Sequence, residues 1–582
     1  MKHCLVQLFL AFFLYIDIYA EIIPRYDIET DLRHSRTNCY SNSAIAQALA
    51  PLFIPSENDS IMTVRLNLIF IQKDDGTGNF QQNDSEHQII IDDAMNILNN
   101  TFMSSLVMPG TDCFSGSESE IVHDTRIRFN DHRYYIRNSA LWDNNLSISG
   151  NNLCPGSSNW YLTTIDDSLN NVLDDSMKGI NIYFTEDATL YHRCWEVQDL
   201  NDTTKFGSDT TNAACSMFPS FYNLNGSSRL HMPCQYSKYW WVKNIVPQLE
   251  SEHNTQWLYN GRLLLSGSIA SELAHELGHS FNLHHPSEDL SHVIYPNTGC
   301  IATIMQPSRY SPRNFLPPNE IGKMYFCSMT SNLQQFIPTD TYLGTKTFNT
   351  TISLPQMRMY YSLLIGVNGN VSLPCNITFS PQGYIKIQNG GVLSVNNALL
   401  QSIQDSWGGI IVQSGGQLLL SDITIGDYNI VVQSGGKLVV RNDLTVMGNH
   451  SIKIENGGYL CINSDASINL VNEFSSIIVS PNAILGCSSC SEDCILTRSG
   501  LTNIGDGHFI TYEGTDFVQD TTILSDYMAT GNAVYVGYDV TTTKPFGKVV
   551  IENGGELRVK ANTAILKKEV EVKVGGKLII NP

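Results

Sequence analysis

A glycine pair recurs through the C-terminal part of the chain, each time within the pattern apolar-x-apolar-x-x-Gly-Gly-x-Leu-x-apolar. The pairs begin at Gly390, Gly415, Gly435, Gly457, Gly554 and Gly575. Neighbouring pairs lie 20 to 25 residues apart, except for one long interval after Gly457. A unit of this length is too small to bury its own apolar face, so the repeat predicts stacked coils.

Apolar residues alternate with other side chains on both sides of each glycine pair, which is the period of a β-strand. Gly-Gly supplies a corner with positive φ between two strands. A row of antiparallel hairpins is the alternative, but the regular spacing favours a parallel β-solenoid over residues 336–582. An insertion is expected around residues 463–545, where "CSSCSEDC" (487–494) indicates disulfides, since no second Cys/His pair for zinc lies nearby.

Strands and helices alternate along residues 61–335, which is typical of an α/β domain with a mixed, partly parallel sheet. Strands are predicted at 62–72, 124–130 and 179–186, and helices at 85–106 and 162–177.

Length and charge limit the class of function. A chain of 582 residues is too long for one core and predicts two or three domains. With 56 acidic against 35 basic residues, the formal net charge is −21, which argues against nucleic acid as a partner because such a surface repels phosphates. The acidic balance leaves Ca2+ binding open, although no calcium-loop motif stands out.

Residues 1–20 predict a secretory signal peptide, with Lys2 in a short basic start, an apolar run, and Ala20 before the cleavage point. A transmembrane anchor is the alternative, but the run is short and contains Asp17. Thirteen of the 14 cysteines follow this segment and fit an oxidising compartment. We therefore expect a secreted, extracellular protein without a transmembrane anchor, with association to the cell surface left open. Residues 21–60 are a candidate propeptide.

The segment "SELAHELGHSFNLHHPSED" (271–289) holds four histidines. His275 and His279 are four residues apart, so on a helix their rings leave one face, with Glu276 beside them. This HExxH pattern holds zinc with two imidazoles and supplies a carboxylate. A catalytic zinc needs a third protein ligand, and His285 lies ten residues after His275, the spacing of the HExxHxxGxxH motif.

That motif ends its helix at a glycine, where this chain has Asn282. Asn is the non-glycine residue that best tolerates the left-handed conformation, so the turn that returns His285 to the metal is feasible. His284 competes as third ligand, but its spacing does not fit, and we expect it to face solvent or to support the site indirectly. A zinc class with a distant glutamate would use Glu288 or Glu320 instead.

"HELGHSFNLHH" (275–285), followed by "CIATIMQPSRY" (300–310), resembles the metzincin metallopeptidases, with Met305 as the methionine of the turn below the metal. "FLPPNEIGKMYFCSM" (315–329) is similar to the C-terminal helix of the pappalysin branch, and "SMFPSFYNLNGSSRLHMP" (216–233) is similar to its sheet-edge segment. The resemblance implies a zincin-type catalytic domain with an active-site helix.

The resemblance also implies further site residues. Family members often have a Tyr two residues after the Met, where this chain has Pro307, and Tyr310 is the nearest substitute as a transition-state stabiliser. Disulfides near the active site are implied as well, with Cys300 and Cys327 as the candidate pair. A prosegment cysteine can silence such enzymes, and Cys39 is the candidate here, although it lacks the expected flanking residues.

These features together predict a secreted zinc endopeptidase that acts on polypeptides. Zinc lowers the pKa of a bound water, and Glu276 would take its proton as general base and pass it to the leaving amine. The Gly-Gly repeats resemble β-solenoid modules that follow enzymes in secreted bacterial proteins, with a glycan or cell-surface ligand left open. The alternative function is a surface adhesion or carbohydrate-binding protein with a vestigial zinc domain.

Overall fold

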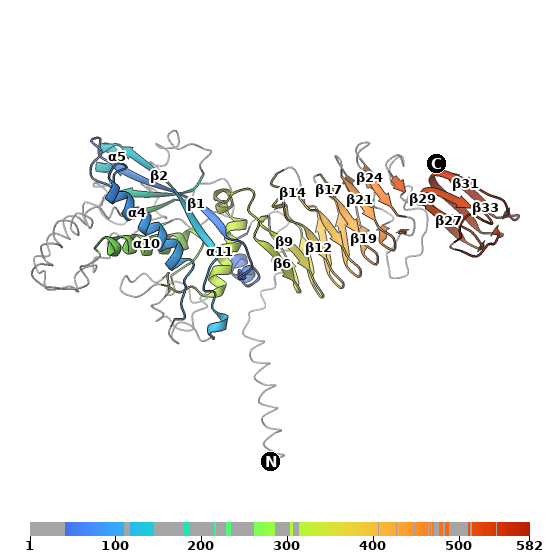
Figure 1. The fold of residues 1–582 in the computed structure, drawn as a ribbon, viewed down its shortest axis with the longest axis horizontal. Helices are drawn as coiled ribbons and strands as arrows, with labels where there is room; N and C mark the ends of the chain where they lie inside the picture. The colour runs from blue at the N-terminus through green and yellow to red at the C-terminus, as the bar shows by residue number, and fades with distance from the viewer. Residues whose placement is uncertain are drawn as a thin grey trace, which may run out of the picture. The chain divides into compact units, whose positions relative to one another are not determined.

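The computed structural model describes residues 41–581 with gaps, and the element labels below are those of Figure 1. The gaps are 110–116, 145–177, 186–214, 217–228, 234–260, 286–302, 306–313, 405–406, 427, 447–449, 464–465, 467, 471–475, 481–482, 488–509, 513–514 and 543. The predicted signal peptide and the predicted helix at 162–177 therefore lie outside the described residues.

The N-terminal part contains a five-stranded sheet in the order β2-β1-β3-β5-β4. Its strands are β1 (Met62–Gln72), β2 (Ile127–Arg137), β3 (Ile180–Thr185), β4 (Cys215–Ser216) and β5 (Arg229–Pro233). The pairs β1–β2, β1–β3 and β3–β5 are parallel, whereas β4 pairs antiparallel with β5. The three strands predicted from the sequence are all present, and the sheet is mixed and partly parallel as expected.

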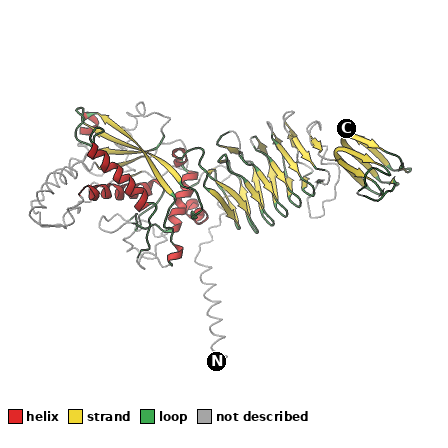
Figure 2. Ribbon diagram, viewed as in Figure 1, coloured by secondary structure: helices red, strands yellow, loops and turns green. Residues whose placement is uncertain are grey.

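Helices accompany this sheet (Figure 2). They include α4 (Ser85–Ile97), α5 (Ser139–Asn144), α10 (Gly261–Ser280) and α11 (Pro318–Thr330). Asp84 caps α4 by accepting from the amides of Glu86 and His87. The predicted helix at 85–106 is α-helical only to Ile97, and a π-helical turn, η2 (Leu98–Phe102), follows. Helix α10 lies against α4, where the Ser266 hydroxyl donates to the Ile90 carbonyl at 3.0 Å.

Residues 41–53 belong to the core of this part of the molecule. They form α3 (Ser43–Leu49) and the 3-10 helix η1 (Ala50–Phe53), and Ala46, Ala50 and Phe53 are fully buried. Gly322 of α11 approaches the Ala50 carbonyl so closely that a Cβ would overlap it. The folded region therefore begins before residue 61, and removal of residues 41–60 as a propeptide would expose this apolar surface. Residues 21–40 of that segment lie outside the described part.

The C-terminal part consists of parallel strands that coil three to a turn (Figures 1 and 2). One sheet contains β6 (Gly344–Phe348), β9 (Tyr361–Ile365), β12 (Ile385–Ile387), β15 (Ile410–Val412), β18 (Ile430–Val432), β21 (Ser451–Ile454), β24 (Ser476–Val479) and β26 (Ile510–Tyr512). A second contains β7 (Thr351–Ser353), β10 (Asn370–Leu373), β13 (Val392–Asn396), β16 (Gln417–Ser421), β19 (Lys437–Val440), β22 (Tyr459–Ile462) and β25 (Ile484–Cys487). The third contains β8 (Met357–Met359), β11 (Ile377–Phe379), β14 (Leu400–Ser402), β17 (Ile423–Ile425), β20 (Leu444–Val446) and β23 (Ile468–Leu470). This pairing confirms a parallel solenoid and rules out a row of hairpins for these strands.

The two glycines of each corner have different tasks, as Gly435 and Gly436 show. Gly435 has φ +75, and the Gly436 amide donates to the Gln433 carbonyl at 2.8 Å, which closes a turn with its left-handed residue at the third position. A Cβ on Gly436 would lie 2.5 Å from the Val412 carbonyl oxygen of the preceding coil. The first glycine therefore allows the turn, and the second allows the coils to stack closely.

Residues 463–545, where the sequence predicts an insertion, contribute strands to the stack. Strands β23 to β26 continue the three ladders, and a second stack begins within the same interval. This second stack has one sheet of β27 (Thr515–Val518), β29 (Asp526–Val536), β31 (Glu556–Leu566) and β33 (Lys577–Asn581), and another of β28 (Thr521–Ile523), β30 (Val549–Ile551) and β32 (Val570–Val572). Most of "CSSCSEDC" lies outside the described residues.

A buried ion pair joins the segment before β1 to the first coil of the solenoid. Lys346 on β6 lies 3.0 Å from a carboxylate oxygen of Asp59 and donates to the Ile54 carbonyl at 2.7 Å. Tyr361 on β9 donates to the same carboxylate at 3.4 Å. Apolar residues of the N-terminal part and of the solenoid as far as Val479 belong to one hydrophobic cluster. The first coil is thus packed as part of the core.

Among the described residues, no helix is both long and apolar enough to cross a membrane.

Replacement of Gly436 by Ala should destabilise the solenoid, because the added Cβ would press on the Val412 carbonyl. We expect a loss of about 1–3 kcal/mol in the free energy of unfolding, seen as a thermal midpoint lowered by about 2–4 °C per kcal/mol. Gly426→Ala is the matched control, because a Cβ there has no neighbour within 4 Å and the residue lacks a positive φ. Equal midpoints for the two variants would contradict the stacking role of Gly436.

Candidate metal centre

Helix α10 presents its histidines beside a buried apolar stripe. Ile269, Leu273, Leu277 and Phe281 recur at four-residue intervals, and each is at most 1% exposed. This stripe anchors the helix in the core. His275 and His279 leave the neighbouring face and are 7% and 9% exposed, so their rings lie at the edge of the buried region.

The end of α10 determines where the chain goes next. Asn282 has φ +68, its amide donates to the His279 carbonyl at 2.9 Å, and the Leu283 amide donates to the Gly278 carbonyl at 3.0 Å. These two bonds around one left-handed residue form a Schellman motif, the usual way to end a helix sharply at glycine. Asn282 therefore takes the place of the glycine in the long histidine motif, as the sequence predicted.

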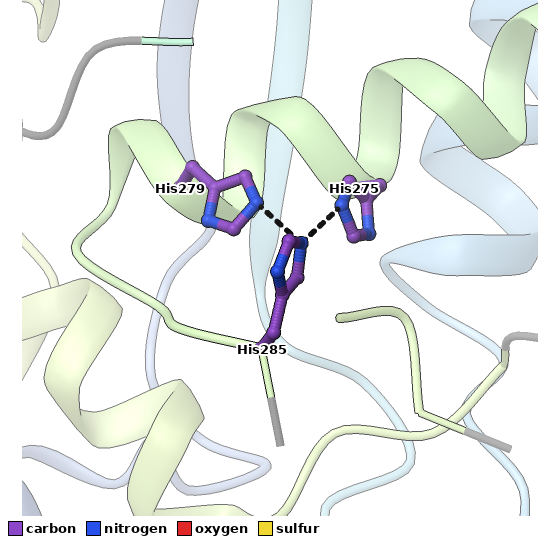
Figure 3. Close-up of side chains that lie close together, drawn as sticks. All are labelled: His275, His279 and His285. Atoms are coloured by element: carbon purple, nitrogen blue, oxygen red, sulfur yellow. Dashed lines mark hydrogen bonds between the residues drawn. The ribbon is translucent and has the colours of Figure 1, made fainter. Parts of the chain in front are cut away.

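The turn brings three imidazoles together (Figure 3). Nε2 of His285 lies 3.0 Å from Nε2 of His275 and 3.0 Å from Nε2 of His279. One ligand atom from each ring falls within 4.8 Å of the others, so the group could hold a metal ion. Tetrahedral bonds of about 2.0–2.1 Å to one ion separate neighbouring nitrogens by roughly 3.3–3.4 Å. The two distances from His285 are therefore within a few tenths of an ångström of that arrangement.

Main-chain carbonyls determine which nitrogen of each helix histidine faces the others. Nδ1 of His275 lies 2.9 Å from the Ile304 carbonyl oxygen, and Nδ1 of His279 lies 2.8 Å from the Leu283 carbonyl oxygen. A carbonyl can only accept, so Nδ1 must bear the hydrogen in both rings. In the neutral rings, both Nε2 lone pairs are then directed toward His285, and this is how metal-binding histidines are commonly oriented.

Met305 packs under the helix at Gly278. The methionine is fully buried, and a Cβ on Gly278 would overlap its sulfur. The residue before it, Ile304, supplies the carbonyl that binds His275, and its amide pairs with the Phe315 carbonyl at 3.0 Å. The predicted methionine therefore packs against α10 at the residue before His279 and belongs to the short segment that orients His275.

The structure also describes three other residues that the sequence analysis considered: Glu276, His284 and Glu320. Glu276 is 4% exposed and lies next to His275 in the helix. Among the described residues, His284 and Glu320 are not in the metal-binding group, which favours His285 over both alternatives. Glu320 instead lies on α11, 3.9 Å from the ammonium of Lys323, and burial raises the pKa of its carboxyl.

Several candidate residues lie outside the described part of the chain. They are Cys39, Glu288, Cys300 and Tyr310.

The suggested disulfide between Cys300 and Cys327 is wrong, because Cys327 has a free, fully buried thiol. Burial raises its pKa to about 12. Cys375, in the solenoid, is disulfide-bonded.

Comparison of the chain with models of known protein families and with curated proteins finds no match.

The sequence pattern did not reveal the carbonyls of Ile304 and Leu283 or the small residue at 278. The two carbonyls are main-chain groups, which any residue would supply, so no side-chain signal exists for them. Gly278 lies inside the HExxH motif, where any residue is allowed. Only the packing of Met305 against the helix explains why this position lacks a side chain.

Gly278→Ala should displace Met305 and disturb the segment that orients His275. We expect a loss of about 1–3 kcal/mol in stability together with weaker metal binding. Gly267→Ala in the same helix is the matched control, because a Cβ there meets nothing within 4 Å and should stabilise the helix by about 1 kcal/mol. Thermal melts and metal titrations of both variants test this, and an unimpaired Gly278→Ala protein would contradict it.

Proposed function

We propose that the protein is a secreted zinc endopeptidase of metzincin type. The observation that supports this most strongly is the convergence of the His275, His279 and His285 Nε2 atoms, two of which are fixed by hydrogen bonds from Nδ1 to the main chain. Two of the imidazoles are on α10, which also carries Glu276, and the third follows the helix. Three convergent imidazoles with a neighbouring glutamate are the residues that a hydrolytic zinc site requires.

The chemistry of the donors favours zinc. Calcium and magnesium prefer oxygen ligands, whereas imidazole nitrogen suits zinc and neighbouring transition metals. Three protein ligands also leave a fourth tetrahedral position for water or substrate, which distinguishes catalytic from structural zinc sites. A zinc ion bound there supplies a Lewis acid that polarises the scissile carbonyl and lowers the pKa of water.

Glu276 is the general base in this proposal. Its carboxylate takes a proton from the attacking water as the oxygen adds to the carbonyl carbon of the peptide bond. The same carboxyl then returns that proton to the leaving nitrogen as the carbon–nitrogen bond breaks. The products are a carboxylic acid and an amine, which become a carboxylate and an ammonium group when the acid's proton passes to the amine at neutral pH. His275 and His279 keep their Nδ1 hydrogens throughout, because each is bound to a carbonyl oxygen.

In this proposal the substrate lies along the edge of the sheet. Strand β4 is the last strand in the described order and pairs antiparallel with β5, and α10 contacts both strands. An extended peptide can add to a free strand edge through main-chain hydrogen bonds. This geometry suits an internal stretch of polypeptide as substrate, and the disulfide at Cys375 supports an oxidising, extracellular setting.

The third ligand can be tested with two neighbouring histidines. His285→Ala should reduce zinc affinity by at least about 100-fold, because a three-ligand site becomes a two-ligand site. His284→Ala is the matched control and should leave zinc content unchanged, since His284 is not in the group. Zinc per protein, measured by mass spectrometry after dialysis, decides between them, and retention of zinc by His285→Ala would disprove the assignment.

Glu276→Gln separates chemistry from metal binding. The amide cannot accept the proton of the attacking water, so we expect casein cleavage to fall by about 100-fold or more while zinc content stays at the wild-type level. Wild-type protein with a chelator, then with zinc restored, is the control for metal dependence. Undiminished cleavage by the variant would exclude Glu276 as the base and indicate a contaminating protease.

The alternative, an adhesion or carbohydrate-binding protein with an inactive zinc domain, is favoured by the solenoid, whose strands make up most of the described C-terminal part. Glycan binding by full-length Glu276→Gln protein, together with no peptidase activity in the wild type, would support that alternative. The intact set of three histidines and Glu276 argues against it.

A further inference from the structure

We infer that Thr303 is a positioning residue for the metal centre, acting through the Ile304 carbonyl that binds His275. This inference rests on the proposed function, since it assigns a residue outside the histidine motif to the same site. Thr303 is not a ligand of the metal. Its hydroxyl fixes one peptide group, and that peptide group fixes one imidazole.

The orientation of His275 depends on a main-chain acceptor. Nδ1 of His275 lies 2.9 Å from the Ile304 carbonyl oxygen. A carbonyl can only accept, so this contact keeps the hydrogen on Nδ1 and leaves the lone pair on Nε2, the nitrogen that faces His285. Without the contact, the neutral ring can carry its hydrogen on Nε2 instead, which blocks metal binding there. The position of the Ile304 oxygen therefore affects how strongly His275 binds a metal ion.

The Thr303 hydroxyl holds the peptide group that carries this oxygen. The Ile304 carbonyl and the Met305 amide belong to one planar trans peptide group, in which C=O and N–H point in opposite directions. The Met305 amide donates to the Thr303 hydroxyl at 3.3 Å. The peptide group is thus held at its oxygen by His275 and at its nitrogen by Thr303. Rotation of this peptide plane would break both hydrogen bonds.

The residues on both sides of this peptide group are fixed by other contacts. Thr303 is fully buried and forms a parallel bridge with Phe315, and the Ile304 amide donates to the Phe315 carbonyl at 3.0 Å. On the other side, the Met305 side chain packs against Gly278. A peptide plane between two fixed residues can still rotate, through opposite changes in the two dihedral angles that flank it. The Thr303 hydroxyl opposes that rotation.

Burial makes the hydroxyl difficult to replace. Met305 is fully buried, so its amide needs a partner within the protein. A side chain two residues earlier can accept from that amide only if it carries a suitable oxygen, as Ser, Thr, Asn and Asp do in turns of this kind. Valine has nearly the shape of threonine but lacks the oxygen. The chemical identity of residue 303, and not only its size, should therefore affect zinc affinity.

Thr303→Val and Thr303→Ser test this, because valine keeps the size of threonine without the oxygen, whereas serine keeps the oxygen. We expect Thr303→Val to weaken zinc binding by about 10-fold and Thr303→Ser by less than about 3-fold, in line with the effect of groups that support metal ligands. The measurement is the zinc Kd of the full-length protein, obtained by competition with a chromophoric chelator. Melting of the zinc-free protein, in chelator, reports stability separately.

Thr330→Val on α11 is the matched control. Thr330 is 2% exposed, and its hydroxyl donates to the Phe326 carbonyl at 2.8 Å, so this variant also loses a buried hydroxyl and its hydrogen bond. We expect its zinc Kd to stay within about 2-fold of the wild-type value, because effects at independent sites are not shared. An equal loss of zinc affinity in Thr303→Val and Thr330→Val would show that affinity follows general stability, and would overturn the positioning role.

Thr303→Ala and Thr303→Ser form a second pair, which differs by one oxygen at a smaller size. Thr303→Ala should also weaken zinc binding by about 10-fold, so this comparison remains informative if valine does not fold at this position. If neither Thr303→Val nor Thr303→Ala folds, the hydroxyl serves the fold rather than the metal centre, and the inference is wrong.

The outcomes separate this inference from the proposed function. If the wild type binds no zinc, both fail. If the wild type binds zinc while the Val and Ala variants share its Kd, or differ from it only in melting temperature, the positioning role is wrong and the proposed function stands. A Thr303→Ser protein that binds zinc as weakly as Thr303→Val would also overturn the role, because the oxygen would not be the group that matters.

Discussion

The left-handed backbone at position 282 is the constraint on which the cluster of His275, His279 and His285 depends. Helix geometry alone places His275 and His279 on one face, but a helix that continued would carry His285 away from them. Because Asn282 has φ +68, the helix ends there and the chain turns back within three residues. The Leu283 carbonyl then binds one helix histidine while His285 meets both. One residue's conformation thus brings the third histidine to the other two and orients one of them.

The sequence was sufficient to predict which histidine side chains come together, because their spacing follows regular helix geometry. The interval between His275 and His279 is fixed by the pitch of a helix, and the position of His285 follows once a turn at Asn282 is assumed. The groups that orient the rings were not predictable, since they are carbonyls of Leu283 and Ile304. The Cys300–Cys327 pairing came from family resemblance, and it failed because the Cys327 thiol on α11 is free and fully buried.

The solenoid was predicted from its glycine pairs, and the strands without such pairs were harder to recognise. The corner before β10 has Asn368 and Gly369 in place of two glycines, and Asn368 has φ +66. The Val392 amide donates to the Gly369 carbonyl just as the Gln417 amide donates to that of Gly391. Asparagine therefore takes the left-handed position here, and among the described residues it also does so at Asn282 and Asn397. A search for Gly-Gly alone overlooks it.

The buried contact of Asp59 with Lys346 shows why the two halves of the described chain are not independent. Removal of either partner would leave a charge without compensation in the interior, which is far more costly than loss of an exposed pair. The segment that supplies Asp59 also packs on α11 through Ala50. The first coil, the N-terminal segment and helix α11 consequently share one packed region. The half of the described chain that contains the three histidines would therefore be incomplete without the first coil.

The corners of the solenoid imply that its length can change while the hydrogen bonds between neighbouring coils stay the same. Each first glycine donates its amide to the first glycine carbonyl of the next coil, as between Gly390 and Gly415, Gly415 and Gly435, and Gly435 and Gly457. Equivalent bonds would re-form if one whole repeat between Gly390 and Gly457 were excised or duplicated, because these coils present the same edge to their neighbours. Each such event would shorten or lengthen the stack by about 4.8 Å. Unequal recombination between repeats would therefore change the length of the solenoid in steps of one coil.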